Sequence, residues 1–202
     1  MTNVEKLRKN LELNGFQTSF FATAAEATDY LCEKIQGTSV GLGGSMTLET
    51  MGLYERLVEK QNKVSWHWRG TDPNFERAGA AEAEVYLSSA NAIAESGEIV
   101  NIDATGNRVA ATLYGKKKVY IVLGTNKIEP DLEKAIWRAR NIASPLNARR
   151  FKLETPCAVG EELRCYDCHH PRRICKGLVI HMQKLNGVGE CEVVIIDEAL
   201  GY

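Results

Sequence analysis

The chain has 202 residues, of which 44% are hydrophobic and 25% are charged, and its formal net charge is −1. This composition is typical of a globular protein that can bury a substantial core within one domain covering residues 1–202. The near-neutral charge gives no global reason to expect nucleic acid or an anionic membrane as a partner.

The first half of the chain predicts alternating helices and strands. A helix capped at Thr2 and ended by Gly15 precedes a strand at 16–23, and Thr23 caps the next helix. The later elements of this half are a strand at 39–44, a helix at 47–61, a strand at 64–68 and a helix at 72–90. This alternation is typical of βαβ units and predicts an α/β fold with a mostly parallel sheet flanked by helices.

From residue 91 onward the pattern favours an antiparallel extension of that sheet. Apolar runs at 91–95, 97–103 and 107–115 are separated by short turn-forming sequences, which predicts a ribbon of strands. The elements expected after this ribbon are a strand at 117–124, a helix at 130–143, a loop at 144–150, and strands at 177–185 and 191–200.

A glycine turn between the predicted strand at 39–44 and the following helix is a candidate ligand site. Gly41, Gly43 and Gly44 would let the backbone approach a ligand, and Ser45 and Thr47 add hydroxyl donors near the first free N–H groups of the helix. The spacing fits neither a dinucleotide-binding glycine motif nor a P-loop. The alternative is that a tight strand-to-helix turn needs glycine for its geometry alone.

Acidic and polar residues in two turns of the ribbon are further candidates. Glu95 ends a short apolar strand, where open α/β sheets place catalytic groups, so it is a candidate nucleophile or general base. Asp103, Thr105, Gly106 and Asn107 form one tight turn that could bind a ligand. The alternatives are a solvated Glu95 and a turn whose Asp and Asn bond their own backbone.

Arginines in the loop at 144–150 are candidates for anion binding. Arg149 and Arg150 are adjacent, and guanidinium groups bind carboxylate and phosphate in a bidentate manner. Solvated loop arginines are the alternative.

Four of the six cysteines lie within residues 157–175, which we interpret as an insertion between sheet strands. Cys157, Cys165, Cys168 and Cys175 follow a C-x7-C-x2-C-x6-C spacing, and a Cys-x2-Cys pair can reach one ion. The chain begins without an apolar secretory segment, so we expect a cytoplasmic protein in which structural disulfides are uncommon. A Zn²⁺ ion or an iron–sulfur cluster is therefore expected at these cysteines, with free thiols as the alternative.

Four stretches together resemble the LUD-domain (lactate-utilisation, DUF162) family, as a stand-alone member. They are "GLGGSMTLETMGL", "ANAIAESGEIVNIDATGNRVAATLYGKKKVYIVLGTNKI", "SPLNARR" and "TPCAVGEELRCYDCHHPRRIC". The resemblance implies a fold related to the sugar-phosphate isomerase and CoA-transferase superfamily. By that analogy, residues 43–47 match the binding loop and Glu95 matches the position of the acyl-accepting nucleophile.

The resemblance also implies a place in the use of lactate or related organic acids. We expect a small anionic metabolite (a carboxylate, a phosphate or an acyl carrier) to bind at the glycine turn near Glu95. The alternatives are an iron–sulfur redox accessory in the oxidation of L-lactate to pyruvate, working with iron–sulfur proteins, and a zinc-stapled binding protein without catalysis. We expect neither nucleic acid nor a membrane as a partner, and the sequence leaves a homo-oligomer open.

Overall fold

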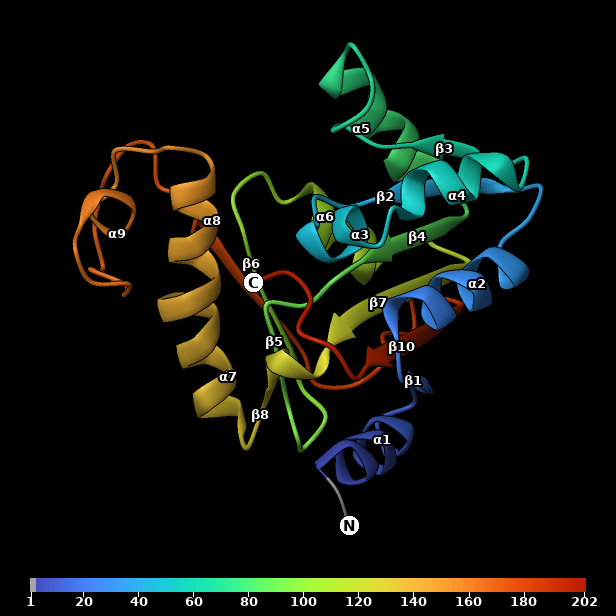
Figure 1. Cartoon of the computed structure of the whole chain (residues 1–202), viewed down its shortest axis with the longest axis horizontal. Coiled ribbons are helices and arrows are strands. Elements are labelled where there is room, and N and C mark those ends of the chain that lie inside the picture. The colour runs from blue at the N-terminus through green and yellow to red at the C-terminus, as the bar shows by residue number, and fades with distance from the viewer. Residues whose placement is uncertain (1–2) are drawn as a thin grey trace.

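The structure, a computed structural model, describes residues 3–202 and contains two β-sheets (Figure 1). The helix cap expected at Thr2 lies outside the described residues. The helices are α1 (Asn3–Leu13), α2 (Ala24–Lys34), α3 (Met46–Thr50), α4 (Leu53–Glu59), α5 (Pro73–Glu82), α6 (Asn107–Leu113), α7 (Leu132–Arg138), α8 (Ser144–Arg150) and α9 (Pro156–Val159). The strands are β1 (Gln17–Phe21), β2 (Ser39–Leu42), β3 (Lys63–Ser65), β4 (Val85–Ser88), β5 (Ala92–Ala94), β6 (Ile99–Asp103), β7 (Lys118–Gly124), β8 (Ile128–Glu129), β9 (Gly177–His181) and β10 (Glu190–Ile196).

The larger sheet is entirely parallel and confirms the predicted α/β class. Its six strands lie in the order β1-β10-β7-β4-β2-β3. All six carboxyl ends therefore lie at the same edge. The smaller sheet has the order β8-β5-β6-β9, with antiparallel pairs on both sides of β6 and a parallel pair between β5 and β8. The antiparallel strands expected at 91–95 and 97–103 are β5 and β6 of this smaller sheet, which is separate from the larger sheet and does not extend it.

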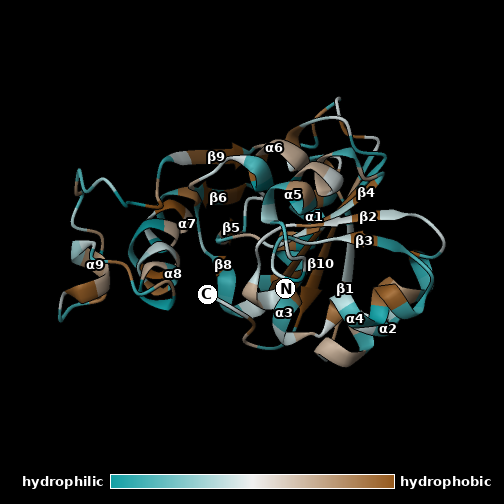
Figure 2. Cartoon of the chain, turned by 90° about the horizontal axis from the view of Figure 1, so that it is seen from above, coloured by the Kyte–Doolittle hydropathy of each residue, from teal (hydrophilic) through white to brown (hydrophobic). Residues whose placement is uncertain are grey.

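Both faces of the larger sheet are buried, because helices cover each of them. Val119, Ile121 and Leu123 of β7 pack toward α1, α5 and α6, while Tyr120 and Val122 pack toward α2, α3 and α4. Strands covered on both faces read as continuous apolar runs, and the hydrophobic colouring of β10 in the interior reflects this (Figure 2). Among residues 3–202, none of the helices combines the length and apolar character that a membrane span requires.

The prediction of one helix at 72–90 is wrong, because this segment contains both a helix and a strand. Helix α5 ends at Glu82, and β4 follows as a buried strand between β7 and β2. The Lys116 side chain is buried against this helix end and donates to the carbonyl oxygens of Ala80 (3.0 Å) and Ala83 (2.9 Å). A cation bound to the last carbonyls stabilises a helix end, so the boundary is fixed by a residue far along the sequence.

The prediction of a strand at 107–115 is also wrong, since this segment forms helix α6. Gly106 precedes it with φ at +89°, a conformation that favours glycine. The carboxylate of Asp103 accepts hydrogen bonds from the N–H groups of Thr105 (3.0 Å) and Gly106 (2.7 Å). This turn reverses the chain at the end of β6 and starts a helix where alternation alone predicts a strand.

Two further boundaries differ from the sequence-based prediction. The helix expected at 47–61 is divided into α3 and α4 by Gly52, whose φ is +60°. The loop expected at 144–150 is helix α8, which continues α7 through a π-helical turn at Ala139–Ala143. Pro145 cannot donate a backbone hydrogen bond, and the wider turn before it lets the helix continue.

Close packing around Gly41 yields a stability prediction. A methyl group added there would lie 2.6 Å from Ala80 O and 2.8 Å from Tyr86 Cδ2. Overpacking of this kind costs about 1–3 kcal/mol, so Gly41→Ala should lower the midpoint of urea unfolding without changing the slope. The matched control is Gly177→Ala, where the nearest atom is Asp103 O at 4.0 Å and the expected change is within about 0.5 kcal/mol. Equal midpoints for the two variants would contradict the packing argument.

Candidate functional site

A cavity of about 160 Å³ lies at the carboxyl edge of the larger sheet. Five strands of the larger sheet are followed by residues that line the cavity. Open α/β sheets bind ligands at this edge. These residues are Ser45 after β2, Trp68 after β3, Ser89 after β4, Lys127 after β7 and Tyr202 after β10. The parallel topology therefore brings together side chains from positions 45 to 202.

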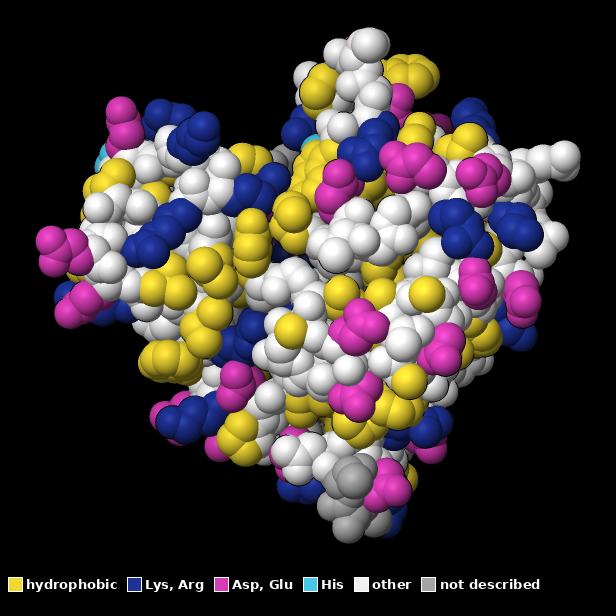
Figure 3. Space-filling view, in the orientation of Figure 1, with side chains coloured by type: hydrophobic (Ala, Val, Ile, Leu, Met, Phe, Trp, Pro, Cys, Tyr) yellow, Lys and Arg dark blue, Asp and Glu magenta, His cyan; other side chains and the backbone are white. Residues whose placement is uncertain are grey.

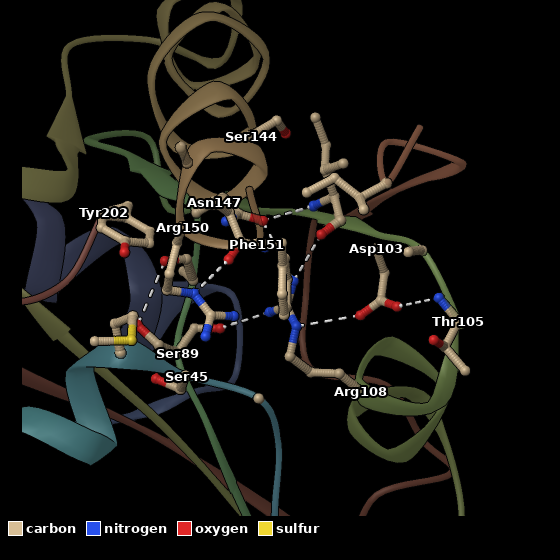
Figure 4. A pocket seen from close by; sticks show the side chains of 18 of the residues that line it. Ser45, Ser89, Asp103, Thr105, Arg108, Ser144, Asn147, Arg150, Phe151 and Tyr202 are labelled. Carbon is tan, nitrogen blue, oxygen red and sulfur yellow. Dashed lines mark hydrogen bonds and ion pairs between the residues drawn. The ribbon is translucent and has the colours of Figure 1, made fainter. Parts of the chain in front are cut away.

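Helix α8 and the turn between β6 and α6 form the opposite wall. Ser144, Asn147 and Arg150 reach the cavity from α8, while Asp103 reaches it from the end of β6 and Arg108 from the start of α6 (Figure 4). The helical segment α7–α8 stands beside the main body (Figure 1), and the surface is hollowed between the two (Figure 3). The cavity is thus bounded by the larger sheet on one side and by a separate helical wall on the other.

Arg108 is the most extensively bonded side chain of the cavity. Its guanidinium donates five hydrogen bonds, which use every N–H that it has. The acceptors are Asp103 Oδ2 (3.2 Å), Ser89 O (3.0 Å), Asn101 Oδ1 (2.6 Å), Asn91 Oδ1 (3.3 Å) and Ile102 O (2.8 Å). Arg108 therefore joins the end of β4 to the smaller sheet. It lends positive charge to the cavity without offering a ligand a free donor.

Arg150 differs from Arg108 because most of its donors are unused. Its guanidinium carbon lies 4.8 Å from the ring centre of Trp68 and 4.0 Å from that of Phe151. Nε donates to Asn147 Oδ1 at 3.0 Å, while within residues 3–202 the two terminal nitrogens donate to no acceptor. Stacking on aromatic rings orients a guanidinium for bidentate binding of a carboxylate or phosphate.

Lys127 lies at the base of the cavity and is buried, with 2% of the residue exposed. Its Nζ lies 2.9 Å from Thr47 Oγ1 and 3.0 Å from Ser89 Oγ, so neither of its hydrogen-bond partners is a carboxylate. Burial lowers the pKa of Lys127 to about 7, and the positive charges of Arg138 and Arg108 add to this effect. The amine therefore exchanges its proton near neutral pH.

His67 adds a second base close to the glycine turn. Burial lowers its pKa below the ordinary value, and the charges of Arg77 and Arg150 lower it further, against an opposite effect of Asp103. The imidazole is therefore neutral at pH 7, and its Nε2 would lie 3.4 Å from a methyl group added at Gly44. A neutral imidazole can both donate and accept a hydrogen bond.

Comparison with known proteins identifies the family. The LUD domain matches residues 4–196, nearly the whole chain. The chain belongs to the LUD-domain family. It is 30% identical over 101 residues to the uncharacterized protein YkgG of Escherichia coli (strain K12), an alignment covering 50% of this chain and 43% of YkgG. The chain thus matches less than half the length of that relative.

A solved structure supports the fold of this LUD domain. The crystal structure of a DUF162 family protein from Deinococcus radiodurans superimposes with a TM-score of 0.55, covering 97% of this chain and 99% of the other at 11% identity. The family predicted from the four matching stretches is therefore confirmed, and so is its α/β fold.

The predicted glycine turn of the LUD domain divides into two groups. Gly44 and Ser45 line the cavity, and Thr47 bonds Lys127 from just behind it. Gly41 and Gly43 lie outside the lining, packed against α5, Tyr86 and Arg108. Ser45 also caps α3 by accepting from Leu48 N at 3.2 Å. Part of the glycine pattern thus follows from packing, as the alternative reading expects.

The second predicted turn lies at the cavity, where Asp103, Thr105 and Asn107 belong to its lining. Gly106 provides the turn itself, and Asp103 bonds the backbone of its own turn as well as Arg108. The structure therefore brings this turn together with the glycine turn, although the two are about sixty residues apart in sequence.

The two predicted arginines have different neighbours. Arg150 faces the cavity, whereas Arg149 donates to Gly160 O at 2.8 Å and to Cys157 O at 3.4 Å. Arg149 therefore holds the segment that contains the cysteines against α8.

Glu95 does not line the cavity. It lies at the carboxyl end of β5, while the cavity receives Ala90 and Asn91 from just before that strand. The Glu95 carboxylate forms an ion pair with Lys6 of α1 at 2.8 Å, and its backbone oxygen accepts from Asn10 Nδ2 at 2.6 Å. Its catalytic role remains a prediction, and these contacts give it a role in anchoring α1.

The four cysteines of the insertion are not gathered around one point. Within residues 3–202, no group of three or more His, Cys, Asp or Glu side chains is placed to hold a metal ion. Cys165 accepts from Arg140 Nη2 at 3.7 Å, and Cys157 contacts Thr155 Oγ1 at 3.4 Å. The expected zinc ion or iron–sulfur cluster at these cysteines remains a prediction.

Three of the lining residues that the sequence-based reasoning missed are basic: Lys127, Arg108 and His67. Lys127 comes three residues after the apolar strand β7, so the strand-end rule that selected Glu95 could also have found it. Arg108 was concealed by the wrong assignment of α6 as a strand. His67 sits in an aromatic run whose strand ends at Ser65, two residues before it.

The buried amine of Lys127 predicts a pH-dependent stability. Between its folded pKa of about 7 and the unfolded value of 10.5, the unfolded chain binds more protons at this position. The Lys127 contribution to the free energy of unfolding therefore rises with pH in this window, by about 1 kcal/mol per pH unit. Lys127→Met should gain stability relative to wild type near pH 7 and lose that advantage toward pH 10.5. Urea unfolding across this range measures the difference.

The control for this experiment is Lys134→Met, which changes an exposed lysine on α7. Its difference from wild type should stay constant over the same pH range. A constant difference for Lys127→Met as well would contradict the buried, readily deprotonated amine.

The metal prediction has a direct test. Protein purified without oxygen should carry stoichiometric zinc, or iron with sulfide, if the cysteine spacing reflects a metal site. The double variant Cys165→Ser/Cys168→Ser should then lose the metal, while Cys32→Ala, which changes a buried cysteine of α2, should keep it. Metal-free wild-type protein from such a preparation would contradict the prediction.

Proposed function

We propose that this LUD-domain protein binds a small organic acid, of the lactate class or its phosphorylated analogues, in the cavity at the carboxyl edge of the larger sheet. The observation that carries the proposal is the Arg150 guanidinium, stacked on Trp68 and Phe151 with its terminal nitrogens unused. A half-buried guanidinium with free donors is satisfied by an anionic ligand.

The charges around the cavity support an anion over a cation. Among its lining residues, Arg108, Lys127 and Arg150 are basic and Asp103 is acidic. The Asp103 carboxylate is already occupied by Arg108 and by two backbone N–H groups. An incoming carboxylate or phosphate therefore meets unpaired positive charge.

The size of the cavity supports a ligand with few atoms. Its volume of about 160 Å³ is below the range of roughly 300–1,000 Å³ that is typical of sites for drug-sized ligands. A three-carbon acid or inorganic phosphate fits this size better than a dinucleotide or a complete acyl carrier. The indole of Trp68 and the rings of Phe151 and Tyr202 provide apolar contacts for a short carbon chain.

Lactate enters this proposal through the family. The LUD domain is associated with lactate utilisation, and a 2-hydroxy acid offers a carboxylate for Arg150 together with a hydroxyl group. Ser45, Ser144 and Asn147 are polar lining residues that could bind such a hydroxyl. Cytoplasmic location belongs to the same proposal.

Two adjacent arginines provide the test. Arg150→Gln should weaken the binding of L-lactate, pyruvate or inorganic phosphate at least tenfold, because hydrogen bonds to charged groups contribute about 1.5–3 kcal/mol. Isothermal titration calorimetry measures the dissociation constants. Arg149→Gln is the matched control, since its guanidinium bonds Cys157 O and Gly160 O outside the cavity.

Glu95→Gln is a second control and should bind these acids as wild type does. Weaker binding in this variant would support the site near Glu95 that the sequence predicts. No binding of any of the three acids to wild-type protein would contradict the proposed function.

A further inference from the structure

The Lys127 amine has a hydrogen-bond environment that distinguishes its two protonation states. An ammonium group has three N–H donors and no lone pair, whereas a neutral amine has two N–H donors and one lone pair. Two hydroxyl oxygens surround Nζ, Thr47 Oγ1 at 2.9 Å and Ser89 Oγ at 3.0 Å. This number of acceptors matches the neutral amine.

The hydrogens of both hydroxyl groups have acceptors elsewhere. Thr47 Oγ1 donates to Leu200 O at 3.2 Å, and Ser89 Oγ donates to Ala90 O at 3.4 Å. Each hydroxyl oxygen is therefore free to accept a hydrogen from Nζ. With both amine hydrogens donated in this way, the nitrogen lone pair has no donor from these two partners.

The charges that face Lys127 favour the same state. Arg108 approaches from α6 and Arg138 from α7, while α3 and the end of β4 contribute the hydroxyl groups of Thr47 and Ser89. Arg138 is itself buried and lies 3.7 Å from the Glu129 carboxylate. A desolvated lysine beside another cation is a recognised form of activated amine nucleophile.

We propose that Lys127 is a covalent nucleophile that forms a Schiff base with a carbonyl-bearing acid, and that the ligand class of this cavity is therefore the 2-oxo acids. The proposal rests on the proposed function, because the same cavity must first bind a small acid. Lys127 lines the cavity that Arg108 and Arg150 make positive, so the amine and the carboxylate-binding groups share one space.

The chemical step balances without a redox partner. The Nζ lone pair adds to the carbonyl carbon and gives a carbinolamine. Water then leaves with the carbonyl oxygen and both amine hydrogens, and a carbon–nitrogen double bond joins Lys127 to the ligand. The hydroxyl groups of Thr47 and Ser89, already hydrogen-bonded to Nζ, are placed to relay the departing protons.

Reductive trapping tests the proposal. Wild-type protein is incubated with pyruvate or glyoxylate and sodium cyanoborohydride, which reduces an imine to a stable secondary amine. Intact-mass and peptide analysis should find one reduced ligand unit on Lys127. L-lactate, which has the same carbon skeleton as pyruvate but no carbonyl group, should give no adduct.

Variants separate the cavity amine from surface lysines. Lys127→Met and Lys127→Arg should both lose the adduct, and the second variant keeps the positive charge. Lys134→Met, which changes an exposed lysine of α7, should retain the adduct. Adduct at wild-type levels in Lys127→Met, or an adduct spread over exposed lysines, would overturn the proposal.

Calorimetry on the same samples distinguishes the two levels of inference. Binding of pyruvate without trapping overturns the Schiff base and leaves the acid-binding function intact. Absence of both binding and trapping for pyruvate, glyoxylate and L-lactate overturns the proposed function and the Schiff base together. Circular dichroism and thermal unfolding confirm that each variant is folded before either result is used.

Discussion

The guanidinium of Arg108 is the interaction on which the geometry of the cavity depends. Its five hydrogen bonds connect the backbone after β4 with Asn91, Asn101 and the end of β6. The two sheets also share a hydrophobic cluster in which Ile93 and Ile99 of the smaller sheet pack with residues of β7 and β10. A guanidinium whose N–H groups are all hydrogen-bonded is costly to displace, because each lost bond would leave a buried group unpaired. The smaller sheet is thereby fixed at the carboxyl edge of the larger one.

The cavity is lined by more basic than acidic side chains. Arg108 has its compensating carboxylate in Asp103, whereas Lys127 is held by hydroxyl groups and Arg150 by aromatic rings. Basic groups that are partly or fully removed from water without an acidic partner carry a cost in folding that an anionic ligand can offset. Sites that sacrifice stability in this way are commonly functional.

Sequence reasoning recovered the fold class, the family and about a quarter of the residues that line the cavity, for identifiable reasons. The parallel sheet follows from apolar runs such as 117–124, which are buried on both faces and alternate with helices. The order of the strands did not follow, because pairing β10 between β1 and β7 depends on contacts that no local pattern encodes. The turn at Asp103 was found since Asp, Gly and Asn are strong turn formers.

The failures have equally local causes. Segment 107–115 alternates well enough to resemble a strand, and only the αL conformation at Gly106 and the Asp103 carboxylate direct it into α6. Arg149 and Arg150 look equivalent in the sequence, because their separation into different environments depends on the direction of α8. Lys127 looks like an ordinary surface lysine, and its burial arises only when α3 and the segment at Leu200 close over the end of β7.

The adjacency of Arg149 and Arg150 has a mechanical meaning. On one side of α8, Arg149 bonds the cysteine segment. On the other side, Arg150 places a guanidinium with unused hydrogen-bond donors at the cavity. Neighbouring residues on a helix share one rigid frame and cannot be displaced independently. The cysteine segment and the cavity are therefore attached to the same turn of α8, so a displacement of this turn moves both.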